Sequence, residues 1–162
     1  MIATDHEPMV STEFERVYRE SSDSVYRSAY RILGNAEDAE DVLQTVFLRF
    51  LRRDPSLGII DQPEPYLRRA AVNAALDMIR SRKTKTSSIE EMANEPSSNA
   101  RQELNTRLRD ALSRIDAKWA EMFVLRFIEG YGNKEIAKLL DMSETLVAVT
   151  LFRTRQKLQK EI

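Results

Sequence analysis

Cysteine is absent from the 162-residue chain, and histidine occurs once, at His6. Without cysteine the chain has no disulfide bonds, no thiolate chemistry and no cysteine-ligated zinc. One histidine near the N-terminus disfavours a histidine metal site and a serine–histidine relay. No nucleophile–base pair or cluster of metal ligands stands out along the chain either. We therefore expect no enzymatic activity, no metal and no cofactor.

Glycine occurs only four times, and alternating apolar and polar runs are few, which disfavours β-sandwiches and barrels. No apolar run approaches the length of a membrane span, and the N-terminus lacks the basic-then-apolar order of a signal peptide. With 42% hydrophobic and 31% charged residues, the composition is typical of a soluble, helix-rich protein. We expect an all-α, cytoplasmic protein without membrane insertion.

Apolar residues recur every three or four positions in the first half of the chain, which predicts amphipathic helices. The first helix is expected to end at Gly34, which suits a helix C-cap. A second helix follows over residues 36–52, with an acidic start. Three prolines and a glycine indicate a structured loop over residues 54–65, and residues 66–82 are predicted to form an alanine-rich third helix.

Residues 83–100 are polar and serine-rich, which predicts a flexible linker. With residues 1–10 as a disordered tail, the chain divides into two small helical domains, residues 11–82 and residues 101–162. The second domain is expected to end in a helix-turn-helix. Its predicted core includes Leu112, Ile115, Trp119, Phe123 and Leu125. For Trp119, the alternative is a role as a base-stacking platform.

The helix-turn-helix is predicted over residues 133–158. Its turn is expected at Asp141, because aspartate tolerates the left-handed conformation better than most residues. Ser143 suits the N-cap of the following helix, with Glu144 favourably placed in its first turn. Such a motif usually places its second helix in the DNA major groove, although an ordinary helical hairpin is the alternative.

The net charge of −1 is unevenly distributed. Residues 66–85 hold six basic residues against Asp77 alone, whereas residues 1–65 hold thirteen acidic and seven basic residues. Residues 101–162 are basic again, with twelve basic and nine acidic residues. Because local charge is what meets phosphate, both basic regions are compatible with nucleic-acid binding.

Three groups of segments, in this order, resemble the extracytoplasmic-function (ECF) class of bacterial sigma factors, and the resemblance covers nearly the whole chain. They are similar to that family's polymerase-binding helix (residues 34–44 and 47–49), its promoter-melting helix (residues 65–77 and Arg80) and the approach to its helix-turn-helix (residues 123–126, 129–130 and 135–137).

The resemblance implies a non-enzymatic factor that binds core RNA polymerase, directs it to promoters and assists melting. The first domain would recognise the minus-ten element and the second the minus-thirty-five element, and an anti-sigma protein is a further partner that the resemblance allows. Two alternatives stay open. One is a helix-turn-helix regulator that acts without polymerase, and the other is a partner-dependent or decoy module with weakened minus-thirty-five recognition.

By this resemblance, the polymerase-binding residues are expected to be Asp38, Asp41, Val42, Gln44 and Phe47. The alternative is that Val42 and Phe47, together with Val46, belong to the domain core, and that the acidic residues lie on a solvated face. The residues expected to bind minus-ten DNA are Arg68, Arg69, Asn73, Asp77, Arg80 and Arg82. For Arg69, Asn73 and Asp77, which share a helical face, the alternative is a hydrogen-bond ladder on the helix surface.

The predicted recognition helix departs from the family. Where the family usually has glycine, then lysine, serine and arginine, this chain has Thr145, then Ala148, Val149 and Thr150, and Phe152 replaces a common histidine. These side chains can touch thymine methyls but cannot make the bidentate arginine–guanine contact. We expect weaker, less salt-dependent or differently specific minus-thirty-five binding. The candidate DNA-binding residues here are Ser143, Thr145, Ala148, Val149, Thr150, Arg153, Arg155 and Lys157.

Overall fold

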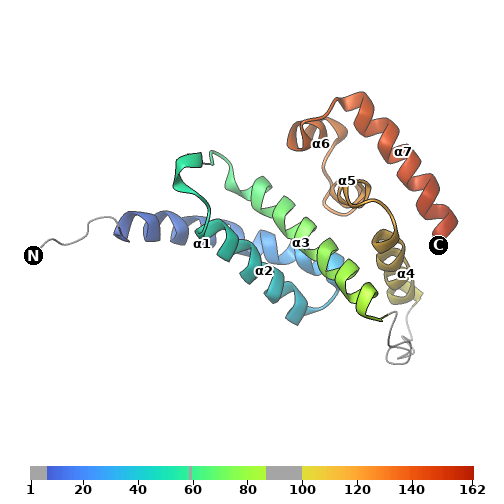
Figure 1. Cartoon of the computed structure of the whole chain (residues 1–162), viewed down its shortest axis with the longest axis horizontal. Coiled ribbons are helices and arrows are strands. Elements are labelled where there is room, and N and C mark those ends of the chain that lie inside the picture. The colour runs from blue at the N-terminus through green and yellow to red at the C-terminus, as the bar shows by residue number, and fades with distance from the viewer. Residues whose placement is uncertain (1–6, 59, 87–99) are drawn as a thin grey trace, which may run out of the picture. The chain divides into compact units, whose positions relative to one another are not determined.

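The computed structural model describes residues 7–58, 60–86 and 100–162, and within these ranges it contains seven α-helices, one short 3₁₀ helix and no strand (Figure 1). The all-α prediction is confirmed. The chain divides into two compact units, residues 1–74 and 75–162, so this division falls inside a helix. The sequence predicts the domain boundary in residues 83–100, and of these residues 87–99 lie outside the described ranges.

The first helix, α1, covers Glu7–Leu33 and begins four residues earlier than predicted. Residues 7–10, expected in the disordered tail, are therefore helical. Pro8 does not prevent this, because the missing N–H of a proline in the first helical turn would have no acceptor in the helix. The helix ends as predicted at Gly34, which has φ 69° and donates its N–H to the Tyr30 carbonyl at 2.7 Å.

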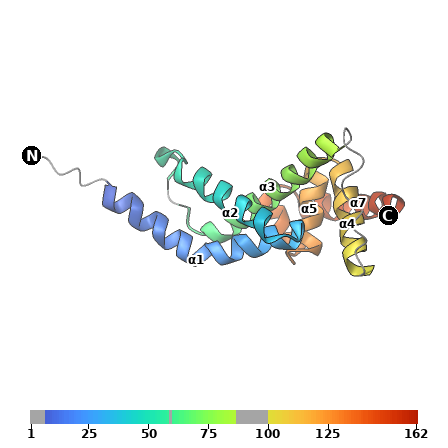
Figure 2. The ribbon, with the colours of Figure 1, turned by 90° about the horizontal axis from the view of Figure 1, so that it is seen from below.

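The second helix, α2, covers Ala36–Leu51 and is capped by Asn35, whose side-chain oxygen accepts the Asp38 N–H at 3.1 Å. Because only two residues connect them, α1 and α2 form an antiparallel hairpin and lie side by side (Figure 2). Phe14 of α1 accordingly contacts both Phe47 and Phe50 of α2, with ring centroids 6.1 and 6.4 Å apart. The hairpin core consists of Val17, Val25, Ala29, Ile32, Ala39, Val42, Val46 and Phe47.

The loop after α2 contains a short 3₁₀ helix, Pro55–Leu57. The Ser56 N–H donates to the Asp54 carboxylate at 2.9 Å and lowers the pKa of that carboxyl. The third helix, α3, covers Pro63–Thr86, which is longer at both ends than predicted. Pro63 is suited to a first helical position, and residues 83–86, assigned to the linker by composition, continue the helix. Near its start, α3 is joined to α1 by the Ser24 hydroxyl, which donates to Glu64 at 2.9 Å.

The second unit contains α4 (Ala100–Arg114), α5 (Ala117–Phe127), α6 (Asn133–Leu140) and α7 (Glu144–Glu161). Helix α7 packs against the other three. The predicted core positions Leu112, Ile115 and Leu125 are buried, whereas Trp119 and Phe123 are only half-buried. The prediction was wrong for these two because α5 turns Ala120, Met122 and Val124 inward instead.

Candidate nucleic-acid and polymerase interfaces

The helix-turn-helix consists of α6, a three-residue turn and α7. Asp141 adopts the left-handed conformation, with φ 53° and ψ 54°, and the following Met142 N–H donates to the Ala137 carbonyl at 2.9 Å. The Ser143 hydroxyl caps α7 by accepting the Leu146 N–H at 3.1 Å. Both predictions about this turn are confirmed, because each depended on local backbone chemistry alone.

The buried side of α7 follows a helical spacing and consists of Val147, Thr150, Leu151, Thr154 and Leu158. Thr150 is only 8% exposed, and its carbonyl accepts the Thr154 hydroxyl at 2.7 Å. The expectation that Thr150 touches DNA is therefore contradicted. Ala148, Val149 and Thr150 are consecutive, and successive residues of a helix point in directions about 100° apart, so they cannot all face one surface.

The opposite side of α7 is exposed and includes Thr145, Val149 and Phe152. Ala148 is exposed beside them, and Ser143 is exposed at the helix start. The residues of α7 that were expected to contact DNA, apart from Thr150, are thus accessible to a partner. Leu146 and Phe152, which are 49% and 63% exposed, were not among the expected DNA contacts, although their spacing from Val149 placed them near the same face.

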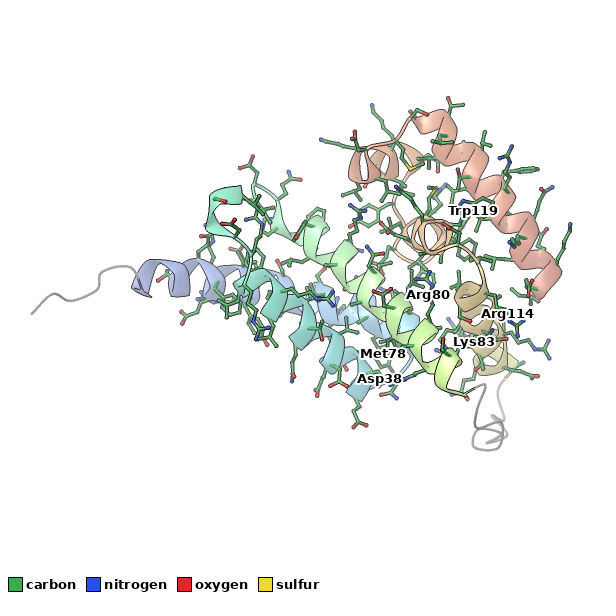
Figure 3. The ribbon with its side chains drawn as sticks, in the orientation of Figure 1. Asp38, Met78, Arg80, Lys83, Arg114 and Trp119 are labelled. Atoms are coloured by element: carbon green, nitrogen blue, oxygen red, sulfur yellow. The ribbon has the colours of Figure 1, made fainter. Side chains whose placement is uncertain are left out.

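The basic residues of α7 are exposed in its second half. The Arg155 guanidinium lies over the Phe127 ring of α5, 5.5 Å from its centroid, and the Lys157 ammonium lies 5.9 Å from the Trp119 ring. Trp119, labelled in Figure 3, is half-buried, and its ring is already in contact with Lys157. Cation–π contacts of this kind restrict where the two charges can lie. Arg153 is also exposed, four residues before Lys157.

On α3, one face carries Arg69, Asn73 and Asp77 at successive i, i+4 spacings, as expected. Asp77 is exposed and pairs with Arg80, with a nitrogen–oxygen distance of 3.5 Å, while Arg69 and Asn73 are partly exposed. Tyr66 lies three residues before Arg69 and is 49% exposed. Tyr66 was not among the residues predicted to bind DNA, although its spacing from Arg69 indicated the same face.

Arg68 is directed away from this face. Its Nε donates to the hydroxyl of Ser28 on α1 at 3.4 Å in a partly buried position. This contact places Arg68 at the junction of two helices, and its expected role in DNA binding stays a prediction. Arg82 is exposed further along α3.

The expected polymerase-binding residues of α2 fall into two groups. Asp38, labelled in Figure 3, is 7% exposed, and Val42 and Phe47 are 1% and 3% exposed, so these three belong to the domain interior. Asp41 and Gln44 are exposed. A surface role for Val42 and Phe47 is contradicted, and the alternative that they are core is confirmed, because α1 covers this side of α2.

The exposed side of α2 forms a continuous stripe, which we call the α2 stripe. It consists of Glu37, Glu40, Asp41, Gln44, Leu48 and Leu51. Leu48 and Leu51 are each 49% exposed and were not among the predicted contact residues, although Leu48 follows Gln44 by four residues. The stripe therefore combines acidic residues in its first half with apolar residues in its second.

Two further findings concern the described part of the chain. None of its helices has the length and apolar character needed to cross a membrane. Within residues 7–58, 60–86 and 100–162, no group of three or more acidic or histidine side chains could hold a metal ion.

The fold and its exposed faces define a helical protein with a helix-turn-helix in its second unit. Comparison with known families is more specific. The profile of Sigma-70 region 2 matches residues 17–85, and that of Sigma-70, region 4 matches residues 105–158. The chain is 32% identical over 152 residues to the RNA polymerase sigma-E factor of Streptomyces coelicolor, which covers 93% of this chain and 86% of that relative.

Two other relatives extend the comparison. The ECF RNA polymerase sigma factor SigE of Mycolicibacterium smegmatis is 31% identical over 158 residues, covering 90% of this chain and 60% of that relative. A sigma factor, RpoE of Bartonella quintana, solved in complex with the anti-sigma factor NepR, has the same fold, with a TM-score of 0.55, 16% identity and coverage of 92% and 96%. The chain belongs to the sigma-70 family, in its ECF class, and the expectation of a sigma factor is confirmed.

Proposed function

We propose that this sigma factor contacts core RNA polymerase through the α2 stripe and presents α3 and α7 to promoter DNA. The single observation that carries the polymerase site is the exposure of the α2 stripe in a helix whose other side is buried and packs against α1. A helix that packs against its own domain on one side has only the other side for a partner. The proposed contacts are therefore Asp41 and Gln44, with Leu48 and Leu51 added in place of Val42 and Phe47.

The chemistry of the α2 stripe fits a partner surface that is basic at one end and apolar at the other. Exposed ion pairs mainly set the register and rate of an encounter, whereas desolvated apolar side chains supply most of the affinity. Leu48 and Leu51 are the apolar anchors of this proposal, and Asp41 sets the register.

The test is a pull-down of core RNA polymerase with the full chain. Leu48→Ala should weaken binding about tenfold, which corresponds to roughly 1.4 kcal/mol, because it removes one of the two apolar anchors of the stripe. Asp41→Arg should weaken it as well and make the remaining binding depend differently on salt. The matched control is Glu20→Arg, which reverses an exposed acidic residue of α1. Unchanged binding of both α2 variants would refute the site.

For α3, we propose that Arg69, Asn73 and Tyr66 hold the separated minus-ten strand. Holding single strands requires cations for phosphates and flat groups on which unpaired bases stack. Arg69 supplies the charge, Asn73 supplies hydrogen bonds and Tyr66 supplies the flat group. For α7, the proposed role is binding of the minus-thirty-five duplex through the exposed face around Val149.

Core polymerase and promoters lie in the cytoplasm of a bacterium, and we place this factor there. The surfaces described on the three helices are binding surfaces, and we propose no chemistry for the chain itself. An anti-sigma protein stays a proposed further partner, on the strength of the family resemblance alone.

A further inference from the structure

The exposed face of α7 is unusually apolar for a helix expected to read DNA. Leu146, Val149 and Phe152 are 49%, 41% and 63% exposed, and Ala148 is exposed beside them. The helix already buries its other side against α4, α5 and α6. Several large apolar side chains left together on one exposed face indicate a binding surface.

Side chains that read bases by paired hydrogen bonds are missing from the first half of this helix. Between Ser143 and Phe152 the only charged residue is Glu144, and there is no arginine, lysine, asparagine or glutamine. The Ser143 hydroxyl is already used as the helix cap. A recognition helix contacts base edges mainly through its N-terminal residues. This segment therefore cannot make the paired contacts that identify guanine or adenine.

An apolar face has one complementary group in the major groove. Among the four bases only thymine presents a methyl group there, and alanine, threonine methyl and phenylalanine are typical contacts to it. Thr145, Val149 and Phe152 follow one another at i, i+4 and i+7, so they form a line that can lie along the groove floor.

The charges beyond this line favour DNA over an apolar protein partner. Arg153, Arg155 and Lys157 follow directly in the second half of α7 and are exposed. Two of them lie over aromatic rings of α5, Arg155 over Phe127 and Lys157 over Trp119. Cations beside an apolar reading surface are complementary to phosphates beside a groove.

We propose that α7 selects its upstream promoter element by thymine 5-methyl groups, which pack against Thr145, Val149 and Phe152. This proposal rests on the proposed function of α7 in promoter binding. It adds that thymine is the base that α7 reads, and it assigns this specificity to Thr145, Val149 and Phe152.

The test uses holoenzyme assembled from the full chain and core RNA polymerase. Promoters are first selected from a library of duplexes with a randomised upstream element, and the selected element should be rich in thymine. Each of its thymines is then replaced by deoxyuridine, which pairs identically and lacks only the methyl group. Affinity should fall about fourfold for each contacted methyl, the factor that corresponds to burial of one CH₂-sized group.

Protein variants locate the effect. In Val149→Ala and Phe152→Ala, which change exposed side chains, the ratio of affinities for thymine and uracil duplexes should move towards one. Arg153→Ala is the matched control from the same helix, because loss of a phosphate contact should weaken both duplexes equally and leave the ratio unchanged.

Two results would overturn the proposal in distinguishable ways. If initiation depends on the promoter but the affinities for thymine and uracil duplexes are equal at every upstream position, methyl reading is refuted and the sigma function stays intact. If Phe152→Ala also abolishes initiation in that case, the apolar face binds a protein partner. Absence of any promoter-dependent initiation would refute the proposed function itself, and with it this proposal.

Discussion

The exposed faces of α3 and α7 have opposite chemistry, although both belong to segments that the family uses on promoter DNA. The α3 face has an aromatic ring, a guanidinium, an amide and a carboxylate in sequence, from Tyr66 to Asp77. The face of α7 is apolar around Val149, and its cations come only in the second half of the helix. The two helices are therefore suited to different states of DNA.

The difference follows from what each state of DNA exposes. Separated strands expose phosphates and base faces, which favour cations, hydrogen-bonding groups and flat rings. A closed duplex exposes base edges in its groove, where an apolar side chain meets a methyl group. We infer that α3 contributes mainly to opening, and that α7 contributes mainly to placement on the closed duplex.

The largest effect is expected on the α3 side. An Arg69→Ala, Asn73→Ala double variant should reduce promoter opening about a hundredfold, because each side chain removed would lose a contact worth roughly 1.5 kcal/mol or more. Permanganate footprinting of the holoenzyme on promoter DNA measures the opened thymines. Arg27→Ala, which removes an exposed arginine of α1 that pairs with Asp23, is the control. Normal opening in the double variant would assign Arg69, Asn73 and Asp77 to a hydrogen-bond ladder on the helix surface instead.

The next effect concerns the aromatic member of the same face. Tyr66→Ala should reduce open complex about tenfold, since stacking of one base on an aromatic ring contributes roughly 1–3 kcal/mol. Tyr66→Phe keeps the ring and should restore opening in the same footprinting assay. If both variants lose activity equally, the hydroxyl and not the ring is required, and the stacking role is wrong.

A smaller effect is expected for α7, on the salt dependence of promoter binding. Ala148→Lys places a cation beside the apolar face, and the slope of log affinity against log salt for promoter binding should become steeper by about 0.9, the value for one added phosphate contact. Gln102→Lys adds the same charge at an exposed position of α4 and should leave the slope unchanged. An unchanged slope for Ala148→Lys would show that position 148 does not lie near a phosphate.

The smallest effect separates the folding of α7 from its reading of DNA. Ser143→Ala removes the cap that accepts the Leu146 N–H, and the free energy of unfolding should fall by about 1 kcal/mol. Thr145→Ala, at an exposed position that makes no cap, should change stability little. Thermal denaturation followed by circular dichroism measures both. If Ser143→Ala is as stable as the unchanged protein, water satisfies the Leu146 N–H as well as the Ser143 hydroxyl does.

Local features of the chain were predicted well where local chemistry decides them. The stop at Gly34, the left-handed turn at Asp141 and the cap at Ser143 each depend on a few neighbouring residues, and all three are confirmed. Helix ends were less accurate, since Pro63 and residues 83–86 look like loop by composition yet continue a helix.

Site predictions failed where the buried side of a helix had to be known. Val42 and Phe47 were considered for a partner, but α1 covers them, and Thr150 was considered for DNA, but it faces the core of its own domain. In the other direction, Leu48, Tyr66 and Phe152 are exposed and were not among the predicted contact residues.

The sequence by itself determined the all-α class, the order of the helices and the chemistry of the helix-turn-helix turn, because these depend on spacing, composition and local hydrogen bonds. Only the tertiary structure decided which residues remain available to a partner. An amphipathic helix can bury an apolar residue against its own domain or offer it to another molecule, and the two cases have the same spacing. The neighbouring helices make that choice, and here they leave a polar face on α3 and an apolar face on α7.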